Sequence, residues 1–167
     1  MNTVSFQGKP MHLIGNLPGI GSRPSDFSLV TTDLATRSLD DYKGKALVLV
    51  CVPSLDTPVC DMEVRRFNNE AAALSDKVRI AAVSRDLPFA QARWCGAAGV
   101  KAVEALSDYK NGDFGKNYGI MIEELMLLAR AVFVLAPDGV LTYSQLVPEV
   151  THEPDYAAVL EAVKKIV

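Results

Sequence analysis

The residues best suited to chemistry in this chain are Cys60 and the short loop before it. An apolar run at 46–52 predicts a strand, and the apolar spacing after Cys60 predicts a helix. Thr57 suits the N-cap of that helix and Pro58 its first position. Cys60 then falls in the first turn, where the helix dipole favours an anion. Because the thiolate is the nucleophile, this placement predicts sulfur chemistry.

A reactive thiolate also needs a cation beside it. An ordinary thiol is only about 3% ionised at pH 7, and a strongly reactive one needs roughly 3 kcal/mol more stabilisation of its anion. A helix start supplies about 0.3–2 kcal/mol, so we expect an arginine against Cys60. Arg65 and Arg66 lie further along the helix and point away from its start. Arg130 is the better candidate, since a guanidinium in the apolar run 125–136 either has an anionic partner or lies at a strand end facing water.

Two acidic residues, Asp61 and Glu63, fall in the same first turn. Carboxylates there suit the helix dipole, but their charges would oppose a neighbouring thiolate. We therefore expect both side chains to point to solvent.

The other cysteines, Cys51 and Cys95, are widely spaced and form no C-x-x-C pair. A disulfide framework or a zinc site is therefore not expected, whereas a reactive thiol fits the odd count. Cys51 lies in an apolar run and is interpreted as a core residue. Cys95, between Trp94 and the small residues 96–98, fits either plain packing or a functional role.

Hydrophobic patterning predicts the elements that must hold Cys60. Continuous apolar runs at 46–52 and 78–83 predict strands that are buried on both faces. Helical spacing from Val59 to Leu74 predicts a helix between them, and two strands joined through a helix in this way are expected to be parallel neighbours. The other expected elements are an N-terminal hairpin (3–6 and 11–14), a strand (27–31), a helix from 86 or 88 to 96, a hairpin (131–136 and 140–146) and a helix (154–167). The fold class is therefore α/β, a central mixed sheet flanked by helices with an N-terminal β-hairpin, in a thioredoxin-like layout.

Length and composition fit one soluble domain, residues 1–167. Hydrophobic residues make up 49% of the chain and charged residues 22%, which suits a packed core. The net charge is −3, and the only adjacent basic pairs are Arg65-Arg66 and Lys164-Lys165, so we expect no nucleic-acid surface. No apolar run approaches the roughly 20 residues of a membrane span, and residues 1–15 lack the apolar stretch of a secretion signal.

With Pro53, Thr57 and Cys60 in the spacing P-x-x-x-T-x-x-C, the loop resembles the active site of peroxiredoxins. Further stretches resemble the bacterial thiol peroxidase group of atypical two-cysteine peroxiredoxins, at 54–60, 64–68, 86–91, 93–97, 129–132 and 144–147. The resemblance extends from the N-terminal hairpin to residues 153–156 and so covers nearly the whole chain.

This resemblance implies an enzyme that reduces hydrogen peroxide and organic hydroperoxides with no cofactor and no metal. It implies that Cys60 attacks the peroxide and becomes a sulfenic acid, and that Cys95 then closes an intrachain disulfide, which thioredoxin reduces. It also implies that Thr57 hydrogen-bonds the thiolate or the peroxide and that Pro53 shields the site from water. Arg130 would stabilise the thiolate and polarise the O–O bond. A cytoplasmic homodimer is implied as well.

Three other functions compete with this one. Cys60 and Arg66 fit the C-x5-R loop of tyrosine phosphatases, but the loop would contain two acidic residues and no glycine, and Pro58 commits it to a helix. A cysteine hydrolase would need a histidine oriented against Cys60, and only His152 is remotely available. A thioredoxin-like module that only binds a partner would explain the fold but not these site residues.

Overall fold

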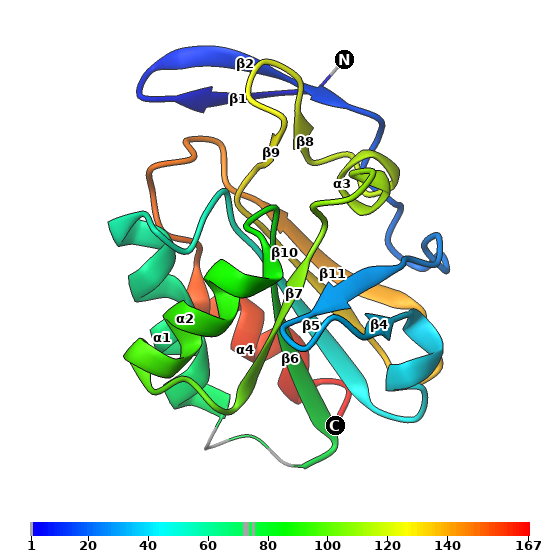
Figure 1. Cartoon of the computed structure of the whole chain (residues 1–167). Helices are drawn as coiled ribbons and strands as arrows, with labels where there is room; N and C mark the ends of the chain where they lie inside the picture. Colours follow the sequence, from blue (N-terminus) through cyan, green and yellow to red (C-terminus); the bar gives the residue numbers. More distant parts are fainter. Residues whose placement is uncertain (1, 72–73, 75) are drawn as a thin grey trace.

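The structure, a computed structural model, describes residues 2–71, 74 and 76–167 (Figure 1). A seven-stranded sheet lies at its centre, with the strand order β11-β10-β5-β6-β7-β3-β4. The three middle strands are parallel: β5 (Ala46–Cys51), β6 (Val78–Ser84) and β7 (Val103–Ser107). The outer strands pair antiparallel with their neighbours: β10 (Ala131–Leu135), β11 (Leu141–Leu146), β3 (Leu29–Thr31) and β4 (Thr36–Arg37). This mixed sheet confirms the predicted α/β fold class.

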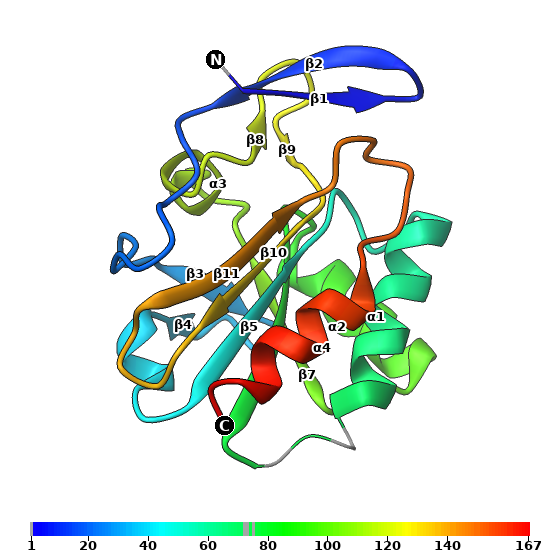
Figure 2. The same ribbon diagram turned by 180° about the vertical axis from the view of Figure 1, so that it is seen from behind.

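Three helices cover one face of the sheet: α1 (Pro58–Ala71), α2 (Pro88–Ala98) and α4 (Tyr156–Lys164) (Figures 1 and 2). The units β5-α1-β6 and β6-α2-β7 join neighbouring parallel strands, so right-handed crossovers place α1 and α2 on the same side. The opposite face packs against aromatic side chains from the 3-10 helix η1 (Leu39–Tyr42), from α3 (Asp113–Asn117) and from nearby loops. The sheet is therefore buried on both faces, as its apolar strands predict.

Strand β5 divides its side chains between two cores. Val48 and Val50 contribute to the cluster under the helices, and Leu49 and Cys51 to the cluster on the other face. Cys51 is fully buried, and burial raises the pKa of its thiol well above the ordinary value. The interpretation of Cys51 as a core residue is confirmed. Its side chain faces away from α1, because alternate residues of a strand point to opposite faces.

A second, four-stranded sheet lies at the end of the molecule where β5 and β6 finish (Figure 1). Its strands are β1 (Thr3–Phe6), β2 (Lys9–Ile14), β8 (Met121–Ile122) and β9 (Leu127–Leu128). The predicted N-terminal hairpin is confirmed, although β2 begins at Lys9. Gln7 and Gly8 both have positive φ, 51° and 80°, as a two-residue hairpin turn requires.

The other predicted elements occur with shifted ends. The strand expected at 27–31 is β3, the helix expected to end at 96 continues to Ala98, and the C-terminal helix spans only Tyr156–Lys164. The apolar spacing in the sequence predicts that this helix reaches Leu74. The structure describes α1 as far as Ala71, and residues 72, 73 and 75 lie outside the described part of the chain. Strands β4, β7, β8 and β9 and the helices η1 and α3 were not predicted. Within the described residues, no helix is long and apolar enough to cross a membrane.

Two glycines give a test of the packing between the loop after β2 and the segment after α3. A Cβ at Gly119, which has φ +72°, would lie 2.3 Å from the carbonyl carbon of Asn16, whereas a Cβ at Gly96 inside α2 would meet nothing within 4 Å. Gly119→Ala should lower the free energy of unfolding by about 1–3 kcal/mol or more. Gly96→Ala should raise it by about 0.5–1 kcal/mol. Urea denaturation of both variants measures the difference, and equal stabilities would contradict this packing.

Candidate active site

Helix α1 starts where the sequence predicts. The N–H of Asp61 donates to the carbonyl of Thr57 at 2.9 Å, so Thr57 holds the N-cap position and Pro58 the first helical one. The Thr57 hydroxyl donates to the carbonyl of Ser54 at 3.0 Å. The contact of this hydroxyl with the thiolate or the peroxide therefore remains a prediction. Pro53, in the same loop, is buried.

An aspartate at the end of the neighbouring strand anchors this loop. The Asp86 carboxylate accepts hydrogen bonds from the Ser54 hydroxyl at 2.7 Å, from the Leu55 N–H at 2.8 Å and from the Ser84 hydroxyl at 2.7 Å. Asp86 is not among the site residues that the sequence predicts. The available signal was that Ser54 and Asp86 each follow a buried parallel strand, and the carboxyl ends of adjacent parallel strands lie at one edge of a sheet.

Cys60 is fully buried, and Arg130 lies beside it with only 2% of its surface exposed. Arg130 precedes β10, and Ala131 pairs with Cys51 across the antiparallel strands β10 and β5. The guanidinium therefore reaches the end of the sheet at which α1 begins. Burial lowers the pKa of Arg130, but the charges of Cys60 and Glu63 and hydrogen bonds to both side chains outweigh it and raise that pKa. The expected cation beside Cys60 is present, and it is held fully charged.

Glu63 is the anionic partner of Arg130, and the prediction that it points to solvent is wrong. Its carboxylate is fully buried and accepts a 2.6 Å bond from Nη1 of Arg130, whose Nε donates to the carbonyl of Val150 at 2.8 Å. Residues three apart share a helix face, so Glu63 lies on the same inward side as Cys60. Burial raises the pKa of Glu63 to about 7, despite the opposing attraction of Arg130. Its Oε1 has no hydrogen-bond partner among the described residues.

Asp61 is also held by neighbours rather than free in solvent, which corrects the second of these predictions. Its carboxylate accepts bonds from Nε of Arg65 at 2.9 Å and from the indole Nε1 of Trp94 at 2.7 Å. The negative charge next to Cys60 is thus paired with the Arg65 cation. Arg66 lies over the ring of Tyr156, 4.1 Å from its centroid. Neither arginine of α1 takes the place of Arg130.

Cys95 lies on α2, a different helix from Cys60, as expected. It is half-buried, and burial raises the pKa of its thiol. All three cysteines are free. His152, which a hydrolase would need against Cys60, is exposed on the loop before α4, whereas Cys60 is buried. This arrangement disfavours the hydrolase alternative.

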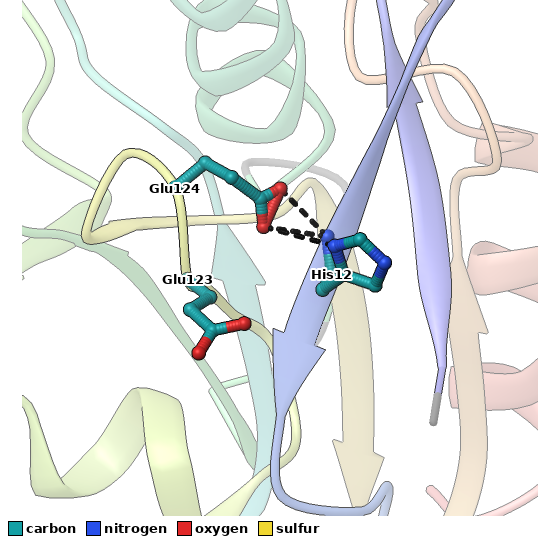
Figure 3. A group of neighbouring side chains, drawn as sticks. All are labelled: His12, Glu123 and Glu124. Carbon is teal, nitrogen blue, oxygen red and sulfur yellow. Dashed lines mark hydrogen bonds and ion pairs between the residues drawn. The ribbon is translucent and has the colours of Figure 1, made fainter.

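One group of possible metal ligands occurs among the described residues, away from the cysteines. His12 on β2 and the adjacent Glu123 and Glu124 bring their ligand atoms within 4.8 Å of one another (Figure 3). All three are exposed, and the Glu124 carboxylate already accepts a bond from the main-chain N–H of His12 at 2.9 Å, which lowers the pKa of Glu124. Exposed groups of this kind are common without a metal. The antiparallel pairing of β2 with β8 explains why His12 lies beside Glu123 and Glu124.

The fold and the site together define a class of protein. A thioredoxin-like sheet carries a buried cysteine in the first turn of α1, with an arginine against it and a second cysteine on the next helix. Such an arrangement is that of a thiol-dependent oxidoreductase.

Comparison with known proteins agrees with this class. The family model described as Redoxin matches residues 20–160. A thiol peroxidase of Bacillus subtilis is 47% identical over 167 residues, covering 100% of this chain and 99% of that protein. One of Halalkalibacterium halodurans is 48% identical and covers 98% of each. The chain belongs to the Redoxin family and, within it, to the thiol peroxidases, which are peroxiredoxins.

Solved structures show the same fold. A peroxiredoxin-like protein from Aquifex aeolicus has a TM-score of 0.93 and 38% identity, covering 100% of this chain and 98% of that one. A thiol peroxidase from Chromobacterium violaceum has a TM-score of 0.87 at 19% identity, covering 98% and 95%. The latter likeness concerns the fold alone.

The raised pKa of Glu63 predicts a pH dependence of stability. The folded protein binds this proton more tightly than the unfolded chain does, so the free energy of unfolding should fall as pH rises from about 4.5 to about 7 and then level off. Glu63→Gln should remove that part of the slope, while Glu161→Gln, at an exposed position of α4, should retain it. Denaturant titrations at several pH values measure this, and an unchanged slope in Glu63→Gln would contradict the assignment.

Proposed function

We propose that this thiol peroxidase reduces hydrogen peroxide and organic hydroperoxides through a sulfenic acid on Cys60 and a Cys60–Cys95 disulfide. The observation that carries the proposal is Arg130, buried against Cys60 in the first turn of α1. A buried guanidinium at a thiol supplies the stabilisation that the helix dipole alone does not.

In the first step the Cys60 thiolate attacks the terminal peroxide oxygen. The S–O bond forms as the O–O bond breaks, and the departing alkoxide or hydroxide takes a proton, leaving Cys60 as a sulfenic acid. Negative charge moves from sulfur to the leaving oxygen, so Arg130 stabilises both ends of the displacement. Since Cys60 is fully buried, side chains above it must move to admit the peroxide.

In the second step the Cys95 thiolate attacks the sulfenic sulfur. The S–S bond forms, the S–O bond breaks and hydroxide leaves as water after protonation. A disulfide requires Cα atoms within about 7 Å, so the cysteines on α1 and α2 approach by local unwinding of a helix. Thioredoxin then returns both thiols by dithiol exchange.

The remaining parts of the proposal follow the resemblance. Thr57 hydrogen-bonds the thiolate or the peroxide once its hydroxyl turns from the Ser54 carbonyl, and Pro53 keeps water from the site. The enzyme works as a homodimer in the cytoplasm, where reducing conditions suit an enzyme with three free thiols.

One equivalent of peroxide should convert the reduced protein to a form two hydrogens lighter, with Cys60 and Cys95 in one cross-linked peptide. Cys95→Ser should react as fast in the first step but gain one oxygen on Cys60 and lose turnover with thioredoxin. Intact mass with peptide mapping checks both results, and Cys51→Ala serves as the control that should behave like the wild type. Full turnover by Cys95→Ser would remove Cys95 from the mechanism.

Arg130→Met should remove the cation beside Cys60 and slow sulfenic acid formation by at least about tenfold, since each 1.4 kcal/mol of lost stabilisation of the transition state is a factor of ten. Stopped-flow measurement of peroxide consumption gives the rate. Arg79→Met, at an exposed position of β6, is the control for the loss of a positive charge. Unchanged kinetics in a folded Arg130→Met would contradict the role of Arg130.

A further inference from the structure

Three side chains join α1 to α2 beside the two reactive cysteines. Asp61 directly follows Cys60, Trp94 directly precedes Cys95, and the indole N–H of Trp94 donates to Oδ1 of Asp61 at 2.7 Å. Arg65 donates from Nε to the other oxygen, Oδ2, at 2.9 Å. We call Asp61, Arg65 and Trp94 the interhelical bridge.

Arg65 extends the bridge along α2. Its guanidinium lies over the ring of Trp94, 5.8 Å from the centroid, and its Nη1 donates to the carbonyl of Ala98, the last residue of the helix, at 3.3 Å. The bridge therefore contacts α2 both at Trp94 and at its end.

The two helices differ in how firmly the rest of the protein holds them. Around the reactive cysteine of α1, Cys60, Glu63, Val64 and Phe67 are each no more than 1% exposed. In α2 the buried residues are Pro88 and Gln91, both in its first half, and every residue at 92–98 is half-buried or exposed. The second half of α2, which carries Cys95, packs against the core only through the partly buried side chains of Trp94 and Ala98, and it includes a helix-weakening glycine at 96.

We infer that the interhelical bridge positions the second half of α2 in the reduced enzyme and that its release controls how fast Cys95 reaches the Cys60 sulfenic acid. This inference rests on the proposed function. When the turn that contains Cys95 leaves its helical place for the disulfide to form, Trp94 moves with it and its bond to Asp61 opens. Asp61, Arg65 and Trp94 are thus positioning residues for the second step and not for the attack on peroxide.

The bridge also explains how an acidic residue is tolerated next to the nucleophile. Both oxygens of Asp61 are engaged by donors from Arg65 and Trp94, and one of these donors is a cation. The charge of Asp61 is therefore used to hold α2 and is compensated beside Cys60.

Trp94 is the only tryptophan of the chain, so its fluorescence reports on the bridge directly. After mixing with peroxide, wild-type fluorescence should change in the phase in which the disulfide forms. The change in that phase should be missing in Cys95→Ser, which stops at the sulfenic acid. A fluorescence change of equal size and rate in Cys95→Ser would overturn the inference, because the bridge would then open without the disulfide.

Two variants weaken the bridge in different ways. Trp94→Phe removes the indole N–H and keeps a ring beneath Arg65, and Asp61→Ala removes both oxygens that accept the bonds of the bridge. Rapid-quench mass spectrometry should show disulfide formation about three- to tenfold faster in each, with less sulfinic acid at high peroxide. The double variant should be no faster than the faster single one, because both changes break the same bond. Arg93→Gln, at the exposed position before Trp94, is the matched control and should keep the wild-type rate.

The outcomes separate this inference from the proposed function. Disulfide formation within twofold of the wild type in both folded variants, or slower than it, would overturn the role of the bridge and leave the peroxidase mechanism intact. Absence of any sulfenic acid or disulfide after peroxide in the wild type would overturn the proposed function and this inference with it.

Discussion

The buried ion pair of Arg130 and Glu63 is the interaction on which the site depends. Two charges taken out of water lose several kcal/mol of solvation each, and this is offset only where their geometry is good and other donors and acceptors are satisfied. Here Arg130 bonds both Glu63 and the carbonyl of Val150 and lies against Cys60. Three contacts from two segments, α1 and the loop before α4, thus fix one guanidinium, and the loop contributes through a main-chain atom.

The pair in turn explains the arrangement of strands around it. An arginine that comes long after Cys60 in the sequence reaches the start of α1 because β10 runs antiparallel to β5. The carboxyl end of β5 and the amino end of β10 therefore meet at one edge, where Asp86 also arrives from β6. A parallel β10 would place Arg130 at the opposite edge. The antiparallel direction of β10 is thus what brings Arg130 to the side of Cys60.

The sequence predicts whatever depends on local pattern. Continuous apolar runs locate β5, β6 and β10, and Pro58 with Thr57 locates the first turn of α1. Strands β8 and β9, of two residues each, have no such pattern, since their partners define them. The prediction for Asp61 and Glu63 was wrong because it considered only their repulsion from a thiolate. Their partners, Trp94 for Asp61 and Arg130 for Glu63, come from other elements of the fold. Helical periodicity, which puts residue 63 on the inward face with residue 60, was the signal available for Glu63.

The position of Cys51 on β5 has a further consequence for an enzyme with three thiols. Strand pleating sends this sulfur into the layer of Leu49 and Phe133, while Cys60 belongs to the layer of Val50 and Val64. The backbone of the central sheet therefore separates the Cys51 sulfur from Cys60 and from α2, the helix that carries Cys95. While the fold is intact, the side of β5 that Cys51 occupies keeps its sulfur from pairing with Cys60.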